Sequence, residues 1–309
     1  MRIGYPCVNR TLGCQGAGTF RLASYTEERQ VETVSSNLAC LETMLRYNVS
    51  QGILFFRLSS NLVPFASHPV CRCDWQGHFA DELAAAGAFV REHHVRISMH
   101  PDQFTLLNSP KVGVLENSLA ELRYHAQVLD LMGLDVSAKI QLHVGGVYGD
   151  RVGSMARFLA RYDALDEFVR RRLVIENDDV SYPLADVLRL SEACGVPALL
   201  DTFHHSILNE GEPLDDALGA AGATWGEGDG LPMVDYATQE PGARAGRHAE
   251  TLVDEDWRAF LAESVGHDMD VMLEIRDKEH SALRAVAIAA DDQRLFRPLS
   301  SRDAQEEGR

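Results

Sequence analysis

Six short apolar stretches of this 309-residue chain end in, or carry, a histidine or a carboxylate. These residues are His100, His143, Glu176, Asp201, Asp235 and Glu274. Carboxylates gathered away from water repel one another and lose hydration, and bound divalent cations resolve that conflict. Mixed imidazole and carboxylate ligands suit Zn²⁺, Mn²⁺ or Fe²⁺ better than Mg²⁺ or Ca²⁺. The residue types therefore predict a metal centre.

Two further histidines extend this ligand set. His204 follows Asp201 by three residues, so both side chains can face one site, and His205 is the alternative to His204. His248 lies in a long connection with a Gly-Arg-His-Ala sequence. About eight ligands exceed what one ion uses, so we expect two or three ions, with Glu176 or another carboxylate bridging them.

Clustered divalent ions favour in-line displacement at phosphorus. One ion lowers the pKa of an attacking water while another stabilises the leaving oxygen. Glu176 and Glu274 are then the catalytic candidates, because they act on that water through the ions. Sugar isomerases and epimerases also use metal-loaded barrels, so the centre alone does not choose between these chemistries.

The elements that must position these residues alternate along the chain. Apolar runs predict strands at 3–5, 53–58, 95–100, 138–144, 172–176, 197–201, 232–236 and 270–275. Amphipathic segments predict helices at 34–47, 80–93, 114–131, 155–170, 183–194, 214–221, 256–265 and 278–289. Strict alternation of this kind indicates a single (β/α)8 TIM barrel, whose strand ends and elaborated loops share the C-terminal face. We expect the barrel domain to cover residues 1–296 and a polar, disordered tail to occupy 297–309.

Composition excludes several classes of protein. The net charge of −17, from 29 basic and 46 acidic residues, argues against a polybasic nucleic-acid binder. It does not exclude a nucleic-acid enzyme, because bound cations would cancel several charges. The chain contains no apolar run of about 18 residues, so no membrane span is predicted. The first residues lack the apolar stretch of a signal peptide. We therefore expect a cytoplasmic protein, and its six cysteines are expected to be reduced thiols.

Motifs along nearly the whole chain, from Met1 to about Arg284, resemble those of the UV damage endonucleases, metal-dependent barrels related in architecture to endonuclease IV. They are Gly4-Tyr5-Pro6-Cys7-Val8-Asn9, Phe56-Arg57-Leu58-Ser59-Ser60, Pro64-Phe65-Ala66-Ser67-His68, Ser98-Met99-His100-Pro101-Asp102-Gln103-Phe104, Leu142-His143-Val144-Gly145-Gly146, Ile175-Glu176-Asn177-Asp178-Asp179, Asp201-Thr202-Phe203-His204-His205, Gly246-Arg247-His248-Ala249 and Leu273-Glu274. One such motif is weak, but a series in order across a full barrel is highly specific.

The resemblance implies a DNA repair nuclease that cuts double-stranded DNA immediately 5′ of UV photoproducts, cyclobutane pyrimidine dimers and 6-4 photoproducts. It would leave a 3′-hydroxyl and a 5′-phosphate, act at the nucleoid, and need no membrane and no obligate protein partner. The resemblance makes Mn²⁺ the favoured ion, with Zn²⁺ as an alternative. The metal ligands it implies are His100, His143, Glu176, Asp201, His204, His248 and Glu274, with His68 near the site as a further candidate ligand. It places Gln103 and Phe104 in a loop that probes the duplex, and Tyr5 and Asn9 near the damaged nucleotides.

The sequence departs from the family pattern at two places. Phe104 stands where the family carries tyrosine, so a stacking ring is kept without its hydroxyl. Met233-Val234-Asp235-Tyr236 stands where the family reads Lys-Val-His-Tyr. Asp235 can replace the histidine ligand with an oxygen ligand, whereas Met233 cannot do what a lysine near the metals would do. The third ion and the metal preference are therefore left open.

Two rival functions belong to other classes. A sugar isomerase or epimerase needs a small closed pocket with a lysine or histidine for proton transfer, and the wide loop after His100 speaks against it. A lesion-binding protein with structural metals would be expected to lack some metal-binding carboxylates, and none of the matched ones is lost.

Overall fold

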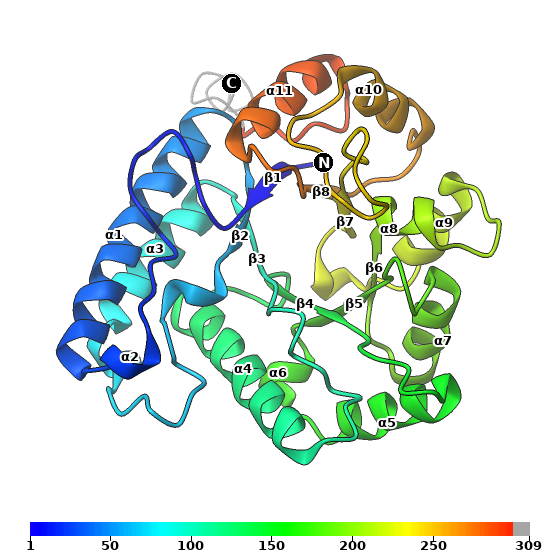
Figure 1. The fold of residues 1–309 in the computed structure, drawn as a ribbon. Coiled ribbons are helices and arrows are strands. Elements are labelled where there is room, and N and C mark those ends of the chain that lie inside the picture. The colour runs from blue at the N-terminus through cyan, green and yellow to red at the C-terminus, as the bar shows by residue number, and fades with distance from the viewer. Residues whose placement is uncertain (299–309) are drawn as a thin grey trace.

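The computed structural model describes residues 1–298. Eight parallel strands close into a barrel in chain order, and helices surround it (Figure 1). This architecture confirms the predicted TIM barrel. The strands are β1 (Ile3–Pro6), β2 (Phe55–Leu58), β3 (Arg96–Met99), β4 (Lys139–His143), β5 (Leu173–Glu176), β6 (Ala198–Asp201), β7 (Met233–Tyr236) and β8 (Asp270–Leu273).

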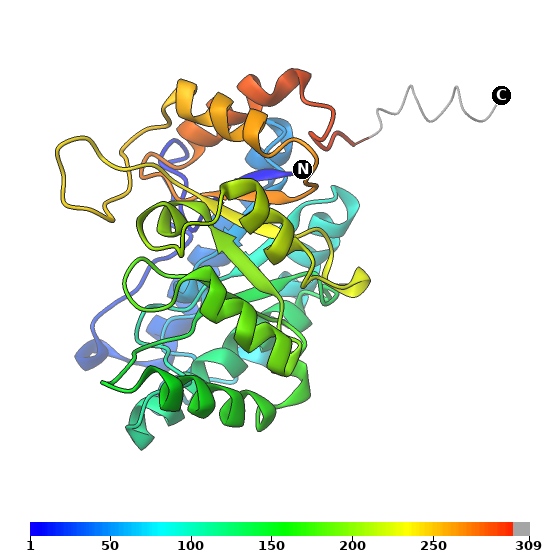
Figure 2. The same cartoon turned by 90° about the vertical axis from the view of Figure 1, so that its right-hand side faces the viewer.

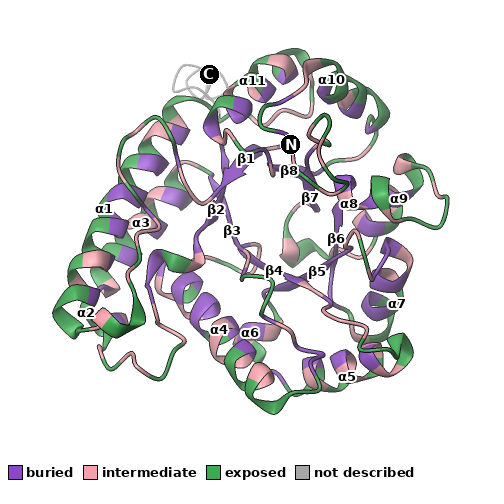
Figure 3. Ribbon diagram, in the orientation of Figure 1, coloured by how far each residue is buried: buried purple, intermediate pink, exposed green. Residues whose placement is uncertain are grey.

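The helices lie outside this barrel, with purple buried faces toward the strands and green exposed faces outward (Figure 3). They are α1 (Glu27–Ser50), α2 (Trp75–His78), α3 (Ala80–Glu92), α4 (Val112–Leu131), α5 (Arg151–Asp163), α6 (Glu167–Arg170), α7 (Leu184–Cys194), α8 (Thr202–Ile207), α9 (Leu214–Gly222), α10 (Asp254–Glu263) and α11 (Glu279–Ile288). Short 3₁₀ helices add η1 (Leu22–Ser24), η2 (Ser60–Leu62), η3 (Glu227–Asp229) and η4 (Ala289–Asp291). In the part of the chain described, no helix combines the length and apolar character that crossing a bilayer requires.

Several sequence-based boundaries need correction. The segment 155–170, predicted as one helix, divides into α5 and α6, because the chain turns extended at Asp166 with a ψ of 137°. The short helices α2 and α8 were not predicted, since four to six residues are too few to show a helical period. A disulfide joins Cys14 to Cys40, so the expectation of reduced thiols is wrong for this pair. Most of the predicted tail, residues 299–309, lies outside the described residues.

The inside of the barrel has an apolar layer below a polar one. Phe55, Val174, Leu199, Met233 and Met272 pack together as a separate buried cluster, which we call the barrel plug. Alternate residues of a strand face the same side of a sheet. The residues two positions after the plug residues therefore form the next layer toward the strand ends, and they are Arg57, Glu176, Asp201, Asp235 and Glu274.

The other end of the barrel is closed by ion pairs. Arg96 donates to Asp270 at 2.9 Å, and Lys139 pairs with Asp229. The charges at this end are therefore paired with one another, whereas the polar layer faces the loops of the C-terminal face. The long connection after β7 projects from that face (Figure 2). The plug thus supports a polar site at the mouth of the barrel.

Candidate metal centre

The first group of candidate ligands comes from β3, β4 and β5. Glu176 Oε1 lies 2.7 Å from His143 Nδ1 and 3.3 Å from His100 Nε2. One donor atom from each of these residues falls within 4.8 Å of the others. Parallel pairing explains the approach, because His143 and Glu176 are register partners on adjacent strands.

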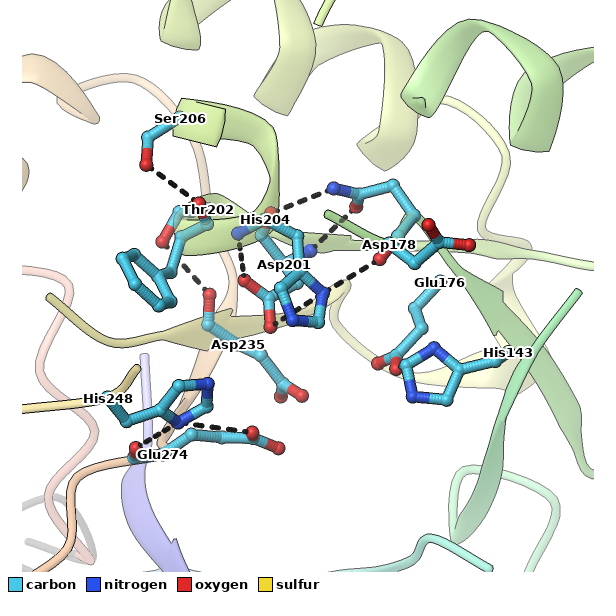
Figure 4. Close-up of polar contacts among 12 residues, drawn as sticks. His143, Glu176, Asp178, Asp201, Thr202, His204, Ser206, Asp235, His248 and Glu274 are labelled. Carbon is cyan, nitrogen blue, oxygen red and sulfur yellow. Dashed lines mark hydrogen bonds and ion pairs between the residues drawn. The ribbon is translucent and has the colours of Figure 1, made fainter. Parts of the chain in front are cut away.

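The second group lies across the mouth and consists of carboxylates. Asp201, Asp235 and Glu274 each offer an oxygen within 4.8 Å of the others. Asp201 and Asp235 are register partners of β6 and β7, and Glu274 directly follows β8. Figure 4 shows these side chains converging on the space between His143 and His248.

His204 and His248 flank the carboxylates with their ring orientation already fixed. His204 Nδ1 lies 3.0 Å from the Asn177 carbonyl, and His248 Nδ1 lies 2.7 Å from the Glu274 carbonyl (Figure 4). A carbonyl oxygen can only accept, so each Nδ1 carries a proton, and in the neutral ring each Nε2 keeps a lone pair for a metal. This second contact is typical of metal-binding histidines.

The imidazoles connect the two groups into one site. Ring centroids lie 5.1 Å apart for His100 and His143, 6.1 Å for His143 and His204, and 6.4 Å for His204 and His248. The structure therefore brings together every strand-end residue that the sequence singled out, plus both additional histidines.

Local structure explains how His204 and His248 reach the site. Asp201 caps α8 by accepting from the His204 backbone N–H at 2.8 Å, so the first turn of that helix folds His204 over Asp201. The connection after β7 pairs with itself, with an isolated antiparallel bridge between Gln239 and His248. This pairing folds the long loop back on itself, so that His248 lies at the mouth of the barrel.

Arg57 is a site residue whose role could not be predicted from the sequence. Its guanidinium lies inside the polar layer, where it donates to both oxygens of Asp235 at 2.8 Å, to Gln141 at 2.7 Å and to Glu274. Gln141 in turn donates to Asp235 at 2.6 Å. The available signal was a charged residue within an otherwise apolar strand, because a buried charge requires a partner of opposite sign.

The charges in this layer do not balance. Three buried carboxylates, Glu176, Asp201 and Asp235, and the half-buried Glu274 face one arginine. Burial, reinforced by the neighbouring carboxylates, raises the pKa of Asp201 to about 6. Burial works in the same direction at Glu274, but the Arg57 guanidinium outweighs it and brings the pKa of Glu274 to about 2.

Burial and the neighbouring carboxylates also shift the pKa values of His143 and His100. Burial alone would lower the pKa of His143, but Glu176 raises it to about 9. At His100, burial dominates and lowers the pKa despite Glu176. His100 Nδ1 is also buried without a hydrogen-bond partner among residues 1–298. Divalent cations fit this donor set, because they would neutralise the excess carboxylates and use imidazole nitrogens as ligands.

Comparison with known proteins identifies the family. The model of the family described as UV-endonuclease UvdE matches residues 1–298. The chain belongs to this family. It is 32% identical to the UV DNA damage endonuclease of Clostridium perfringens (strain 13 / Type A), over 93% of this chain and 70% of that relative. The crystal structure of SacUVDE matches with a TM-score of 0.91 and 44% identity, covering 94% of this chain and 98% of that one.

More distant barrels share the fold alone with this UvdE-family chain. Endonuclease IV from Thermus thermophilus has a TM-score of 0.54 at 18% identity, over 81% of this chain and 93% of that one. The 3-keto-D-glucoside 4-epimerase YcjR from E. coli has a TM-score of 0.55 at 14% identity, over 93% of this chain and 98% of that one. A nuclease and an epimerase match equally well, so the fold does not distinguish the isomerase alternative. Family membership favours the nuclease.

The structure places the two residues of β7 that depart from the family pattern, Met233 and Asp235. Asp235 is fully buried, and its oxygens already accept from Arg57 and Gln141. It lies in the second ligand group, yet it is the most completely paired carboxylate there. Met233 belongs to the barrel plug, one layer below the site, so it packs rather than faces the ligands.

The predicted probing loop stands out from the surface. Phe104 is 71% exposed, and Gln103 is exposed beside it. Asp102 Oδ1 accepts from the Phe104 backbone N–H at 2.8 Å, which forms a tight turn just beyond His100. A buried anchor would have been the alternative role for Phe104, and this exposure contradicts that alternative.

Two other predicted site residues, Tyr5 and Asn9, are buried. Tyr5 is fully buried, and its hydroxyl donates to Asn48 at 2.8 Å and accepts from Asn9 at 3.0 Å. Asn9 is buried as well, and its carbonyl oxygen accepts from the backbone N–H of Leu12 at 3.0 Å. These contacts hold both residues in the loop that follows β1, and their role toward DNA stays a prediction.

His68 is also separate from the two ligand groups. Its ring is exposed, and its Nδ1 accepts from the Val70 backbone N–H at 3.0 Å. Together with His100 and Asp102 it lines a pocket of about 420 Å³ beside the mouth. His68 therefore lies beside the two ligand groups, and its role as a further ligand stays a prediction.

Proposed function

We propose that this chain is a metal-dependent UV damage endonuclease that hydrolyses the phosphodiester immediately 5′ of cyclobutane pyrimidine dimers and 6-4 photoproducts, leaving a 3′-hydroxyl and a 5′-phosphate. Membership of the UvdE family supports the coarser part, an endonuclease that acts on DNA. One structural observation carries the proposal. Two groups of imidazole and carboxylate ligands lie at the same barrel mouth as the exposed aromatic ring of Phe104.

Each ligand group would hold at least one divalent ion. His100, His143 and Glu176 would bind on one side, and Asp201, Asp235 and Glu274, with His204 and His248, on the other. Mn²⁺ is the ion we favour, because it accepts both nitrogen and oxygen ligands, and Zn²⁺ is the alternative. When bound, such ions polarise a phosphate and activate water as a nucleophile near neutral pH.

The chain's own residues prepare the site for this chemistry. Arg57 holds Glu274 and Asp235 in place, and the Asn177 and Glu274 carbonyls keep the Nδ1 protons of His204 and His248. These contacts fix ligand orientation before any substrate arrives, which reduces the reorganisation that the reaction requires.

Recognition of damage would rest on the probing loop. A UV dimer stacks and pairs poorly, so extruding it costs less than extruding intact bases. An exposed aromatic ring can fill the gap left in the helix, and the Gln103 amide can hydrogen-bond an unpaired base. Phe104 and Gln103 would thereby convert the weakened stacking of a lesion into selectivity.

A plasmid nicking assay tests this proposal. Protein stripped of metal by a chelator should not nick UV-irradiated supercoiled plasmid, and Mn²⁺ should restore nicking better than Mg²⁺. Unirradiated plasmid is the control for lesion dependence, and end-labelling of a duplex with one defined dimer locates the cut. Full activity in metal-free protein, or equal nicking of both plasmids, would contradict the proposal.

A further inference from the structure

Lysine is rare in this chain. Only three of its 29 basic residues are lysines, namely Lys111, Lys139 and Lys278. Lys139 is buried at the closed end of the barrel, where it pairs with Asp229, and Lys111 is exposed before α4. Lys278 follows Glu274 by four residues and lies at the mouth, just before α11. A lysine carries a compact point charge where an arginine offers a planar fork, so its presence here suggests a specific requirement.

The backbone of Lys278 is strained. Its φ is 59° and its ψ is −116°, a combination used by mirror-image turns and normally occupied by glycine. A residue with a side chain persists in such a conformation only where its surroundings hold it, and such positions concentrate at functional sites. We therefore expect the Lys278 side chain to have a function that offsets the cost of this backbone conformation.

Contacts on both sides hold this conformation. The Asp277 N–H donates to the Glu250 carbonyl at 2.9 Å, which ties the turn to the loop that carries His248. The buried Glu279 carboxylate accepts from the Arg10 and Thr11 backbone N–H groups at 2.9 and 2.8 Å, which ties the turn to the first loop. Lys278 is thus fixed between two loops at the rim of the metal centre.

The Lys278 side chain is half-buried, and its ammonium has no hydrogen bond or ion pair with any residue in the described range 1–298. Burial lowers its pKa, while the Cys7 thiol and the Glu274 carboxylate oppose that shift, so the ammonium lies in the field of the metal centre. The Lys278 ammonium is near several carboxylates but pairs with none of them. It is therefore free to bind an anion from a ligand.

We propose that Lys278 binds the DNA backbone on the Glu274 side of the metal centre, where its ammonium donates to a non-bridging oxygen of a phosphate. This assignment rests on the proposed function, because it takes the incoming anion to be a phosphodiester. The strongly acidic chain needs local cations where DNA enters, and a rigidly held lysine at the rim meets that need.

Salt dependence of DNA binding tests the assignment without requiring cleavage. Each phosphate contact contributes about one unit to the slope of log Kd against log salt concentration. Lys278→Met should reduce that slope by about one and weaken binding about tenfold at low salt. Lys278→Arg should keep the slope, and Arg46→Met, which removes an exposed charge on α1, should leave binding unchanged. A normal slope in Lys278→Met would overturn the proposal.

Two further measurements separate binding from stability. Lys278→Gly should lose the same DNA contact while its thermal midpoint rises, because glycine relieves the strain. In the wild-type protein, the fraction of Lys278 that an acetylating reagent modifies, measured by peptide mass spectrometry, should fall when duplex DNA is added. Equal labelling with and without DNA would contradict the assignment. If the wild-type protein binds DNA with the expected slope but never nicks irradiated plasmid, the proposed function fails while the Lys278 contact stands.

Discussion

The Arg57 guanidinium lies 2.8 Å from both carboxylate oxygens of Asp235, inside the barrel and just above its apolar plug. Arg57 also pairs with Glu274, so one buried cation serves two carboxylates of the candidate metal centre. Removing one partner of a buried ion pair leaves an uncompensated charge, which is more destabilising than removing both. Arg57 therefore stabilises the barrel even before an ion binds.

Arg57→Met should lower the free energy of unfolding of the metal-free protein by about 3–5 kcal/mol. Asp235→Leu added to this variant should recover part of the loss, because the most deeply buried unpaired carboxylate is then gone. Urea denaturation measures both effects. Arg46→Met on α1 is the control, since its exposed pair with Glu42 contributes at most about 0.5 kcal/mol. A loss no larger than that of the control would show that Arg57 is not needed for charge balance.

The raised pKa of Asp201 predicts a pH dependence for the metal-free protein. Its carboxyl titrates near 3.9 when unfolded and at about 6 when folded. The folded state therefore holds the proton more tightly, so stability is highest below the unfolded pKa and falls as pH rises through about 6. The total change is about 3 kcal/mol. Burial also raises the pKa of Asp235, so Asp201→Asn should reduce this decline between pH 4 and 7 rather than abolish it, measured by denaturation in the presence of a chelator; an unchanged pH profile in the variant would assign the titration to another group.

Glu176→Gln should separate cleavage from binding. The amide keeps the shape of the side chain but removes the charge that faces His100 and His143. We expect nicking of irradiated DNA to fall by orders of magnitude, while lesion binding persists because backbone contacts and the probing loop hold the duplex. Metal content, measured after dialysis against Mn²⁺, should fall in parallel with nicking. Glu42→Gln, on the outside of α1, provides the charge control, and a cutting rate near wild type would make Glu176 a purely structural residue.

The convergence of the candidate ligands could be predicted from the sequence, because it depends on where each strand ends. Each candidate ligand except His204, Asp235 and His248 ends a strand or directly follows one, and parallel strands of a barrel must deliver those ends to one face. His248 needed the resemblance, since its return to the mouth depends on a loop that pairs with itself.

Other features of the structure depend on tertiary contacts, which sequence patterns do not show. Arg57 interrupts an apolar strand, and its three partners come from distant parts of the chain. The hydroxyl of Tyr5 donates to Asn48 on α1, and that pairing is also a tertiary contact. The disulfide between Cys14 and Cys40 likewise depends on how the first loop lies against α1.

The probing loop gives the most discriminating prediction, because it separates a damage reader from a general phosphodiesterase. Phe104 is 71% exposed and contributes little to the core, so Phe104→Ala should not change the fold. Stacking of a base on an aromatic ring is worth roughly 1–3 kcal/mol, so binding to UV-damaged duplex should weaken about 5- to 150-fold. Binding to undamaged duplex should hardly change, because it rests on phosphate contacts.

Parallel titrations of the two duplexes with wild-type protein and Phe104→Ala measure this difference. Val265→Ala is the matched control, because Val265 is 69% exposed but follows α10 at the end of the barrel opposite the metal centre. Phe104→Tyr restores the hydroxyl that the family carries, and it should retain full selectivity because the stacking face is the same. Metal content should be unchanged in all three variants, since none alters a ligand. An equal loss on damaged and undamaged duplex would mean that Phe104 only shapes the loop, and lesion selectivity would then have to come from the pocket beside His100.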